Sequence, residues 1–261
     1  MKISVVINCD TRRTNHQQGG LFNGVVAEDF LTDGIYNKVK FFEGFDAEFI
    51  VFIDEHYYVP ESTLAYLRTI CNTVVVRKHT HEEKFNDYNY LSALQLARGE
   101  IICHFDQDIA AFSNRMLSVQ GLIDMLDGLT TFVSYPSPLA PLPAHDPNYD
   151  YVWCSTRFFM CYREALDFTE IEKCLKDSDY LYGKYPASVR NPWLEHILGL
   201  HAKYNGNGVI YPAIDLNELA IFCWDNYERF TLKRLNELPY EEVKKFVESK
   251  GGIFYPNNLK L

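Results

Sequence analysis

The sequence lacks any apolar run long enough to cross a membrane. Its longest apolar stretches are strand-sized, such as Phe49–Ile53 and Val74–Val76, whereas a membrane helix needs about 20 apolar residues. Residues 1–2 lead directly into an apolar run without the pattern of a signal peptide. We therefore expect no transmembrane segment and a cytoplasmic location, either free or at the periphery of a membrane-bound pathway.

Positive charge is also scarce. Lys and Arg number 25 against 35 Asp and Glu, which gives a formal net charge of -10. DNA and RNA bind to clusters of Lys and Arg, so we expect no nucleic-acid partner. The seven cysteines form no C-x-x-C pair, and most of them lie in apolar segments. This usage is typical of buried, reduced thiols.

Three common catalytic motifs are missing. The chain contains no Walker lysine motif, no G-x-G-x-x-G and no G-x-S-x-G. Kinase, dehydrogenase and serine-hydrolase functions therefore have no support from motifs.

Strand-like and helix-like segments alternate over the first 110 residues. The predicted strands are apolar runs separated by amphipathic helical segments, and they cover Ile3–Cys9, Ala47–Asp54, Thr73–Arg77 and Glu100–Phe105. This order predicts a single α/β domain with a mostly parallel central sheet and helices on both faces. The second half is less regular: residues 178–190 are expected to be irregular, and a helix is predicted from Asn191 to about Lys203.

Acidic residues fall at the carboxyl ends of three of the predicted strands, namely Asp10, Asp54 and Asp106. Ligands of parallel α/β sheets bind beyond the carboxyl ends of the strands, so we expect these side chains to meet at one edge. Asp106-Gln107-Asp108 offers two carboxylates one residue apart, which suits Mn²⁺ or Mg²⁺. The second D-x-D, Asp177-Ser178-Asp179, follows no apolar strand, and we expect it in a solvated loop.

Residues 94–108, Leu-Gln-Leu-Ala-Arg-Gly-Glu-Ile-Ile-Cys-His-Phe-Asp-Gln-Asp, resemble the helix–Gly–strand–D-x-D core of GT-A glycosyltransferases, especially the inverting family 2. The runs Ile3–Cys9 and Phe49–Asp54 resemble the first two strands of that family. The resemblance implies a Rossmann-like GT-A domain, with residues 1–110 as the nucleotide-sugar half and residues 111–261 as the acceptor-binding and catalytic half.

The same resemblance implies transfer of a sugar from a nucleoside-diphosphate sugar, of UDP or GDP type, to a glycan or another hydroxyl acceptor, with inversion. Asp10 and Asp54 would accept hydrogen bonds from the nucleobase or the ribose. Asp106 would face the ribose or a metal-bound water, and Asp108 would ligate the metal. The full set expected to bind the nucleotide sugar comprises Asn8, Asp10, Asp54, Arg98 and Asp106.

Glu195 is the candidate catalytic base. It lies in the first turn of the predicted helix after Asn191-Pro192, where the helix dipole favours a carboxylate, although a surface Glu is common at this position. Trp193 is a candidate floor for the acceptor sugar, and Arg157 is a candidate contact for a diphosphate or an acidic acceptor. At most one of His196 and His201 could be a third metal ligand.

Two other function classes remain open. A nucleotidyltransferase can share the sheet and the acidic metal site, but it usually adds a Gly-rich loop with Arg and Lys after the first strand. Residues 11–24 contain Arg12, Arg13, Gly19 and Gly20 but no Lys. A catalytically silent sugar-binding module is the third possibility, against which the intact acidic pair argues.

Overall fold

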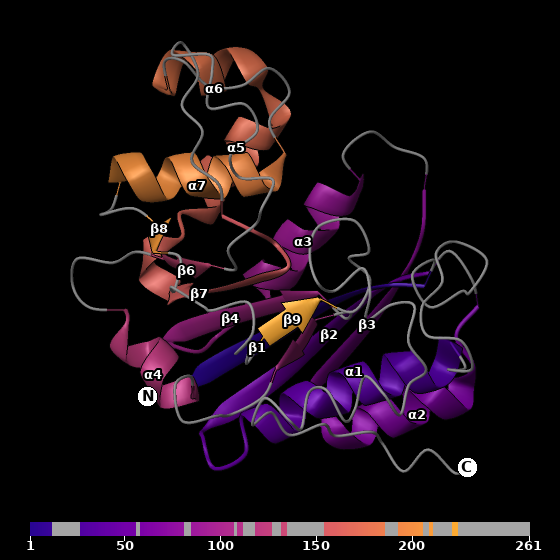
Figure 1. Ribbon diagram of the computed structural model, residues 1–261. Coiled ribbons are helices and arrows are strands. Elements are labelled where there is room, and N and C mark those ends of the chain that lie inside the picture. The colour runs from indigo at the N-terminus through magenta and orange to yellow at the C-terminus, as the bar shows by residue number, and fades with distance from the viewer. Residues whose placement is uncertain are drawn as a thin grey trace.

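The computed structural model describes residues 1–11, 27–55, 58–80, 85–106, 109–111, 118–126, 132–134, 154–185, 193–205, 209–210 and 221–223 (Figure 1). Among these residues, no helix is long and apolar enough to cross a bilayer.

A central sheet of seven strands organises the described chain, in the order β3-β2-β1-β4-β7-β6-β8. β7 runs antiparallel to both of its neighbours, and the other pairs in the sheet are parallel. The strands are β1 Ile3–Asp10, β2 Ala47–Glu55, β3 Thr73–Lys78, β4 Ile101–Asp106, β6 Phe132–Ser134, β7 Phe158–Tyr162 and β8 Val209–Ile210. A separate two-stranded sheet pairs β5 Ile109–Ala111 with β9 Ile221–Cys223 in antiparallel fashion.

Helices cover both faces of the central sheet (Figure 1). One face carries α1 Ala27–Phe41, α2 Glu61–Ile70 and α4 Val119–Asp124. The other carries α3 Phe85–Gln95, α5 Phe168–Lys176, α6 Ser178–Lys184 and α7 Leu194–Asn205, with a 3-10 turn at Arg163–Ala165 before α5. This is the α/β domain with a mostly parallel sheet flanked by helices that the alternating pattern predicts.

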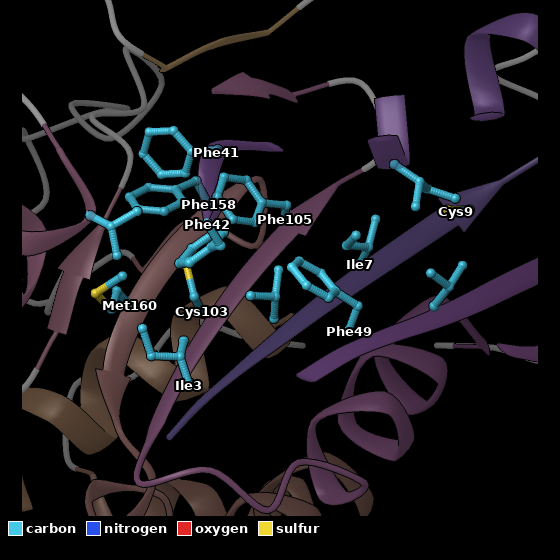
Figure 2. Packing of buried hydrophobic residues seen from close by; sticks show 14 of the residues in the cluster. Ile3, Ile7, Cys9, Phe41, Phe42, Phe49, Cys103, Phe105, Phe158 and Met160 are labelled. Atoms are coloured by element: carbon cyan, nitrogen blue, oxygen red, sulfur yellow. The ribbon is translucent and has the colours of Figure 1, made fainter. Parts of the chain in front are cut away.

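Successive strand residues bury their side chains on opposite faces, as the two-residue period of a strand requires. Ile3, Val5 and Ile7 belong to the cluster under α1 and α2, whereas Val6 belongs to the cluster on the opposite face. Figure 2 shows the first cluster, in which the rings of Phe42 and Phe105 meet edge to face with centroids 6.2 Å apart. The first strands are buried on both faces, which explains their continuous apolar sequence.

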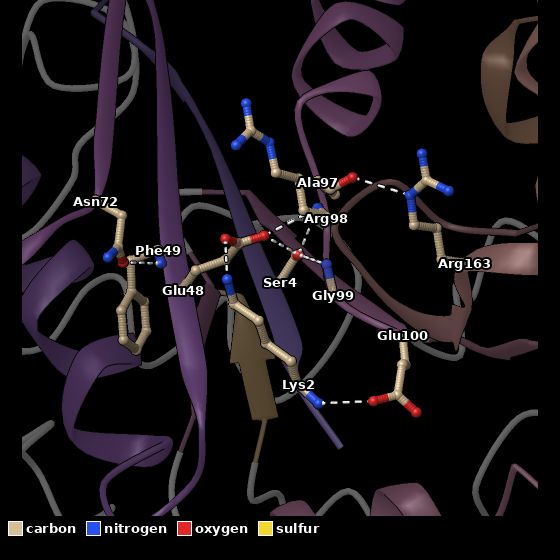
Figure 3. Close-up of polar contacts among 10 residues, drawn as sticks. All are labelled: Lys2, Ser4, Glu48, Phe49, Asn72, Ala97, Arg98, Gly99, Glu100 and Arg163. Carbon is tan, nitrogen blue, oxygen red and sulfur yellow. Dashed lines mark hydrogen bonds and ion pairs between the residues drawn. The ribbon is translucent and has the colours of Figure 1, made fainter.

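A polar network ties the sheet together at the amino-terminal ends of its parallel strands (Figure 3). The hydroxyl of Ser4 donates to Glu48 and accepts from the backbone N–H of Gly99 at 2.7 Å, while Lys2 Nζ pairs with Glu48 at 2.7 Å. Burial opposes ionisation of Glu48, but the hydrogen bonds from Lys2 and Ser4 outweigh it and lower the pKa of this carboxyl. The backbone N–H of Arg98 donates into the same network, to Ser4 Oγ and Glu48 Oε1.

Two local expectations are wrong. Residues 178–184 form α6 rather than irregular structure, because Asp177 caps the helix and accepts a hydrogen bond from the N–H of Tyr180. The second D-x-D is therefore a helix start, not a loop.

The six described cysteines are all free and five of them are buried, as their apolar surroundings predict. The two halves share one sheet, because β7 pairs with β4; their division at residue 110 into donor and acceptor parts stays a prediction.

Candidate active site

The carboxyl ends of β1, β2 and β4 bring several predicted residues to one edge of the sheet. In the parallel register, Asn8 lies opposite Asp106 and Asp10 lies opposite Asp54. Only the backbone of Asp10 is described. β7 is antiparallel to β4, so residues 156–157, which precede β7, lie at this same edge. The convergence follows from the register alone.

Asp106 ends β4 and is buried, with 3% of its surface exposed. The hydroxyl of Tyr90, on α3, donates to its Oδ1, and its backbone N–H donates to the carbonyl of Arg157 at 2.9 Å. A buried carboxylate is costly unless it is hydrogen-bonded or faces a cation. Tyr90 therefore orients this carboxylate at the edge of the sheet.

The side chain of Asn8 is held by a hydrogen bond with His104. The two side chains meet at 2.9 Å between His104 Nε2 and Asn8 Oδ1, and both residues are buried. The imidazole stacks on Phe159, with centroids 5.2 Å apart. Burial lowers the pKa of His104 to about 3, so the ring is neutral at physiological pH and can donate its single N–H to Asn8. His104 thus fixes the orientation of the Asn8 amide.

Asp54 is the penultimate residue of β2 and lies beside two further polar residues. His79 Nδ1 lies 3.1 and 3.2 Å from the two carboxylate oxygens of Asp54. The backbone carbonyl of Asp54 accepts hydrogen bonds from the N–H and the hydroxyl of Thr11. On β3, which neighbours β2, Arg77 donates to Asn89 Oδ1 on α3 at 3.1 Å. This end of the sheet edge is therefore lined with groups that can bind a polar ligand.

Glu195 lies in the first turn of α7, as predicted. Its Oε1 accepts two hydrogen bonds from Thr156, one from the backbone N–H at 2.8 Å and one from the hydroxyl at 2.9 Å. Asp87, in the first turn of α3, accepts a hydrogen bond from the N–H of Leu194 and so anchors the start of the helix.

The electrostatics of Glu195 suit a proton acceptor at neutral pH. Burial raises its pKa to about 7, and the negative charge of Asp106 acts in the same direction. The Thr156 hydrogen bonds and the positive charge of Arg157 oppose this rise. The sequence leaves open which effect on the pKa of Glu195 is larger, the lowering by the helix dipole or the raising by burial. In the structure, burial has the larger effect. The two residues are connected through neighbouring positions: Thr156 donates to Glu195, and the carbonyl of Arg157 accepts from the N–H of Asp106.

Trp193 and His196 flank Glu195. Trp193 is 59% exposed, and its ring lies 6.1 Å from that of His196, whose pKa burial lowers to about 4. His201 lies further along α7, and its Nε2 lies 3.0 Å from the carbonyl of Ala165 while its Nδ1 lies 2.8 Å from the Asn205 amide. Both ring nitrogens of His201 are occupied by these structural contacts, so it is not a free metal ligand.

The structure does not bring every predicted residue to this edge. Arg98 lies three residues before the start of β4 and its N–H belongs to the network with Ser4 and Glu48, whereas Asp106 lies at the other end of that strand. Asp108 lies outside the described residues. Within the described ranges, no three His, Cys, Asp or Glu side chains are grouped so as to hold a metal ion.

Comparison with known proteins identifies a fold but no family. No protein-family model matches the chain, and no curated protein matches it. A structure from Bacillus anthracis, assigned as a glucose-1-phosphate thymidylyltransferase in complex with a sucrose, is similar with a TM-score of 0.54 and 10% identity, over 91% of this chain and 94% of that one.

Two glycosyltransferase structures are also similar. A mannosyltransferase from Pyrobaculum calidifontis, in complex with GDP-Man and Mn²⁺, has a TM-score of 0.44 and 14% identity over 80% of this chain. The present chain covers 54% of that protein, about half its length. The galactosyltransferase LgtC, with donor and acceptor sugar analogs, has a TM-score of 0.44 and 13% identity, over 81% of this chain and 73% of that one. The similarity to the Bacillus anthracis structure, at a TM-score of 0.54, shows that the two chains share a Rossmann-like α/β fold.

Three residues of the site are not predicted from the sequence. His79 directly follows β3, so the strand-end rule that selects Asp54 could have selected it too. Thr156 lies in the Ser155-Thr156-Arg157 segment before β7, but its partner is 39 residues away. Tyr90 is on a helix, and no local pattern indicates that its hydroxyl reaches Asp106.

Proposed function

We propose that this protein is a glycosyltransferase that moves a sugar from a nucleoside-diphosphate sugar to an acceptor hydroxyl, with inversion. The observation that carries the proposal is the carboxylate of Glu195, one oxygen of which is held by Thr156, next to Arg157, whose carbonyl bonds the N–H of Asp106. A carboxyl with a pKa of about 7 is ionised often enough to accept a proton and basic enough to draw one from a hydroxyl.

In this mechanism, Glu195 removes the proton of the acceptor hydroxyl as the oxygen attacks the anomeric carbon. A new carbon–oxygen bond forms to the acceptor. The bond between the anomeric carbon and the phosphate oxygen breaks, and its electron pair leaves with the nucleoside diphosphate. Because attack and departure occur on opposite faces of the sugar, the configuration inverts. Loss of such a base typically costs about 10²–10⁴ in rate.

The donor would lie over the ends of β1, β2 and β4. Asn8, Asp10 and Asp54 would contact the nucleobase and ribose of a UDP- or GDP-type donor, and Asp106 would lie toward the sugar-phosphate part. Support comes from the register, which aligns Asn8 with Asp106 and Asp10 with Asp54. Arg98 is left out of this proposal because its N–H is tied to Ser4 and Glu48, eight residues before Asp106.

Asp106 and Asp108 would hold Mn²⁺ or Mg²⁺. These residues suit the cations because carboxylate oxygens are the ligands that hard cations prefer. The negative charge of Asp106 contributes to the raised pKa of Glu195, and a cation at this edge would relieve the repulsion between the two carboxylates. When bound, such a cation stabilises the charge on the departing diphosphate.

The acceptor would lie on the other side of Glu195. Trp193 is exposed and is two residues from the proposed base, so its ring can serve as a platform for a sugar. The positive charge of Arg157 lowers the pKa of Glu195, and Arg157 would contact a phosphate or an acidic acceptor.

A panel of nucleotide sugars tests the proposal against its two alternatives. The protein is incubated with UDP- and GDP-sugars, Mn²⁺ and a mixture of glycan acceptors, and nucleoside diphosphate is measured. In parallel, nucleoside triphosphates and sugar phosphates are supplied and pyrophosphate is measured. Acceptor-dependent release of nucleoside diphosphate supports the proposal. Pyrophosphate release alone identifies a nucleotidyltransferase, and binding without either product identifies a silent sugar-binding module.

A further inference from the structure

The turn at residues 154–157 joins three parts of the candidate active site. The N–H of Cys154 donates to the backbone carbonyl of Glu195 at 3.1 Å, and the N–H of Ser155 donates to Ser134 Oγ at the end of β6. The carbonyl of Arg157 accepts from the N–H of Asp106 at 2.9 Å. The turn therefore contacts the strand that ends in Asp106 and the helix that begins before Glu195.

Thr156 is at the centre of this turn, and its two hydrogen bonds reach the same carboxylate oxygen. Its backbone N–H and its hydroxyl donate to Glu195 Oε1 at 2.8 and 2.9 Å. Two donors from one residue restrict both the position of the carboxylate and its rotation. Among the described residues, no hydrogen bond is made to the other oxygen, Oε2. Thr156 thus engages only one of the two carboxylate oxygens, Oε1.

We propose that Thr156 is a positioning residue that holds Glu195 with Oε2 toward the acceptor hydroxyl, at a separation from Asp106 set by the 154–157 turn. The inference rests on the proposed role of Glu195 as the base. Its physical basis is that proton transfer requires the reacting oxygen within hydrogen-bond reach of the proton. Supporting groups that lock a catalytic side chain matter because a displacement of about 1 Å can cost about 10²-fold in rate.

Three variants test the proposal in the full-length protein. Thr156→Val removes the hydroxyl but keeps the β-branched shape and the backbone N–H, and Thr156→Ser keeps the hydroxyl. Thr69→Val is the matched control, because the Thr69 hydroxyl bonds the Tyr66 carbonyl on the exposed side of α2. We expect Thr156→Val to lower kcat about 10- to 100-fold with donor KM unchanged, Thr156→Ser to recover most of kcat, and Thr69→Val to match the wild type.

A double-mutant cycle with Glu195→Gln shows whether Thr156 acts through Glu195. In the Glu195→Gln background, Thr156→Val should change the residual kcat less than about twofold, because no base remains to be oriented. A full 10- to 100-fold loss in that background would overturn the proposal. So would a failure of Thr156→Ser to recover activity, since the hydroxyl would then not be the group that matters.

Carbon-13 NMR of labelled Glu side chains provides a readout that does not depend on activity. The Glu195 carboxyl signal, assigned by its loss in Glu195→Gln, should move in Thr156→Val and return in Thr156→Ser. If it does not move while Glu195→Gln is inactive, Glu195 is the base and the positioning role of Thr156 is wrong. If it moves while Glu195→Gln keeps full turnover, the proposed function of Glu195 fails, and Thr156 has nothing catalytic to position.

Discussion

The imidazole of His79 lies 3.1 Å from one carboxylate oxygen of Asp54 and 3.2 Å from the other. The two residues come from neighbouring strand ends, because Asp54 is near the end of β2 and His79 follows β3. The N–H of His79 also donates to the carbonyl of Glu55, which fixes its backbone to β2. His79 therefore orients Asp54 at the edge where we place the nucleotide.

From this pair we predict that Asp54→Asn and His79→Ala weaken binding of the nucleoside diphosphate about tenfold or more. A hydrogen bond to a charged group contributes about 1.5–3 kcal/mol, and either change removes or misaligns one. Calorimetric titration with UDP and GDP measures the Kd. Glu61→Gln, which alters an exposed carboxylate on α2, serves as the control. Unchanged affinity in Asp54→Asn would show that the nucleotide does not contact this carboxylate.

The strand ends were predictable from the sequence and their side-chain partners were not. A continuous apolar run followed by an acid defines where a buried parallel strand ends, so Asp54 and Asp106 follow from pattern alone. Thr156 and Tyr90 join the site through contacts across 39 and 16 residues, which depend on how β7 and α3 pack. No local periodicity contains that information.

Arg98 is a different case, because its backbone lies at the other edge of the sheet. It is only eight residues before Asp106 and belongs to the same recognisable segment. β4, however, lies between them: its six residues, Ile101–Asp106, span about 16 Å at about 3.3 Å per residue, and Arg98 lies before the start of the strand. Proximity in the sequence is thus a poor guide to proximity in the site when a strand lies between. The helix α6 was missed for a different reason, because Asp177 serves as the cap of a seven-residue helix too short for clear periodicity.

The pH dependence of turnover should report Glu195. A general base must be ionised to accept a proton, and burial raises the pKa of Glu195 to about 7. We therefore predict that kcat/KM increases with pH, with a midpoint near 7, and falls about tenfold per pH unit well below it. Rates measured from pH 5 to 9 in buffers of constant ionic strength test this. A profile that is flat between pH 5.5 and 8 would mean that no group with this pKa takes part.

Glu195→Gln should lose activity and gain stability. Transfer should fall about 10²–10⁴-fold because the amide cannot accept the proton. The folded-state pKa of about 7 exceeds the ordinary value of 4.5, so the folded protein holds a proton that the unfolded chain releases, and wild-type stability decreases as pH increases from about 4.5 to 7. The Gln side chain does not ionise, so the variant does not lose this stability as the pH increases. Urea denaturation should show it more stable than the wild type by about 1–2 kcal/mol at pH 8 but not at pH 4.

An equal stability difference at pH 4 and pH 8 would contradict this account, since the gain would then not come from ionisation. Loss of nucleoside diphosphate binding by Glu195→Gln would contradict the assigned role as well, because a base on the acceptor side should leave donor affinity intact.

Metal dependence should be carried by Asp108 and not by the second D-x-D. We predict that Asp108→Ala reduces turnover at least about 100-fold and abolishes the response to added Mn²⁺, because a carboxylate ligand is lost. Asp179→Ala is the matched control: it also shortens the last Asp of a D-x-D, but on the exposed surface of α6. Manganese titrations of both variants and of the wild type give the comparison. Full turnover of Asp108→Ala in EDTA would rule out a metal held there.

Gly99→Ala should destabilise the fold without changing the chemistry. A Cβ at residue 99 would lie 2.7 Å from the carbonyl oxygen of Lys2 and 2.7 Å from the amide nitrogen of Ser4, both backbone atoms that the start of β1 holds in place (Figure 3). The strands must separate to admit the methyl group, and overpacking of this kind costs about 1–3 kcal/mol. Gly183→Ala is the control, because nothing lies within 4 Å of a Cβ there and α6 gains up to about 1 kcal/mol of helix propensity.

Urea denaturation of the two glycine variants should therefore move the midpoint in opposite directions. At a temperature well below both transitions, Gly99→Ala should keep the wild-type kcat and donor KM, because the substitution lies at the edge of the sheet opposite Asp106. A large loss of turnover in the folded Gly99→Ala protein would mean that the amino-terminal edge takes part in donor binding after all, and Arg98 would then return as a candidate contact. Equal stability of Gly99→Ala and the wild type would mean that β1 and the start of β4 are not held as closely as the network of Ser4 and Glu48 requires.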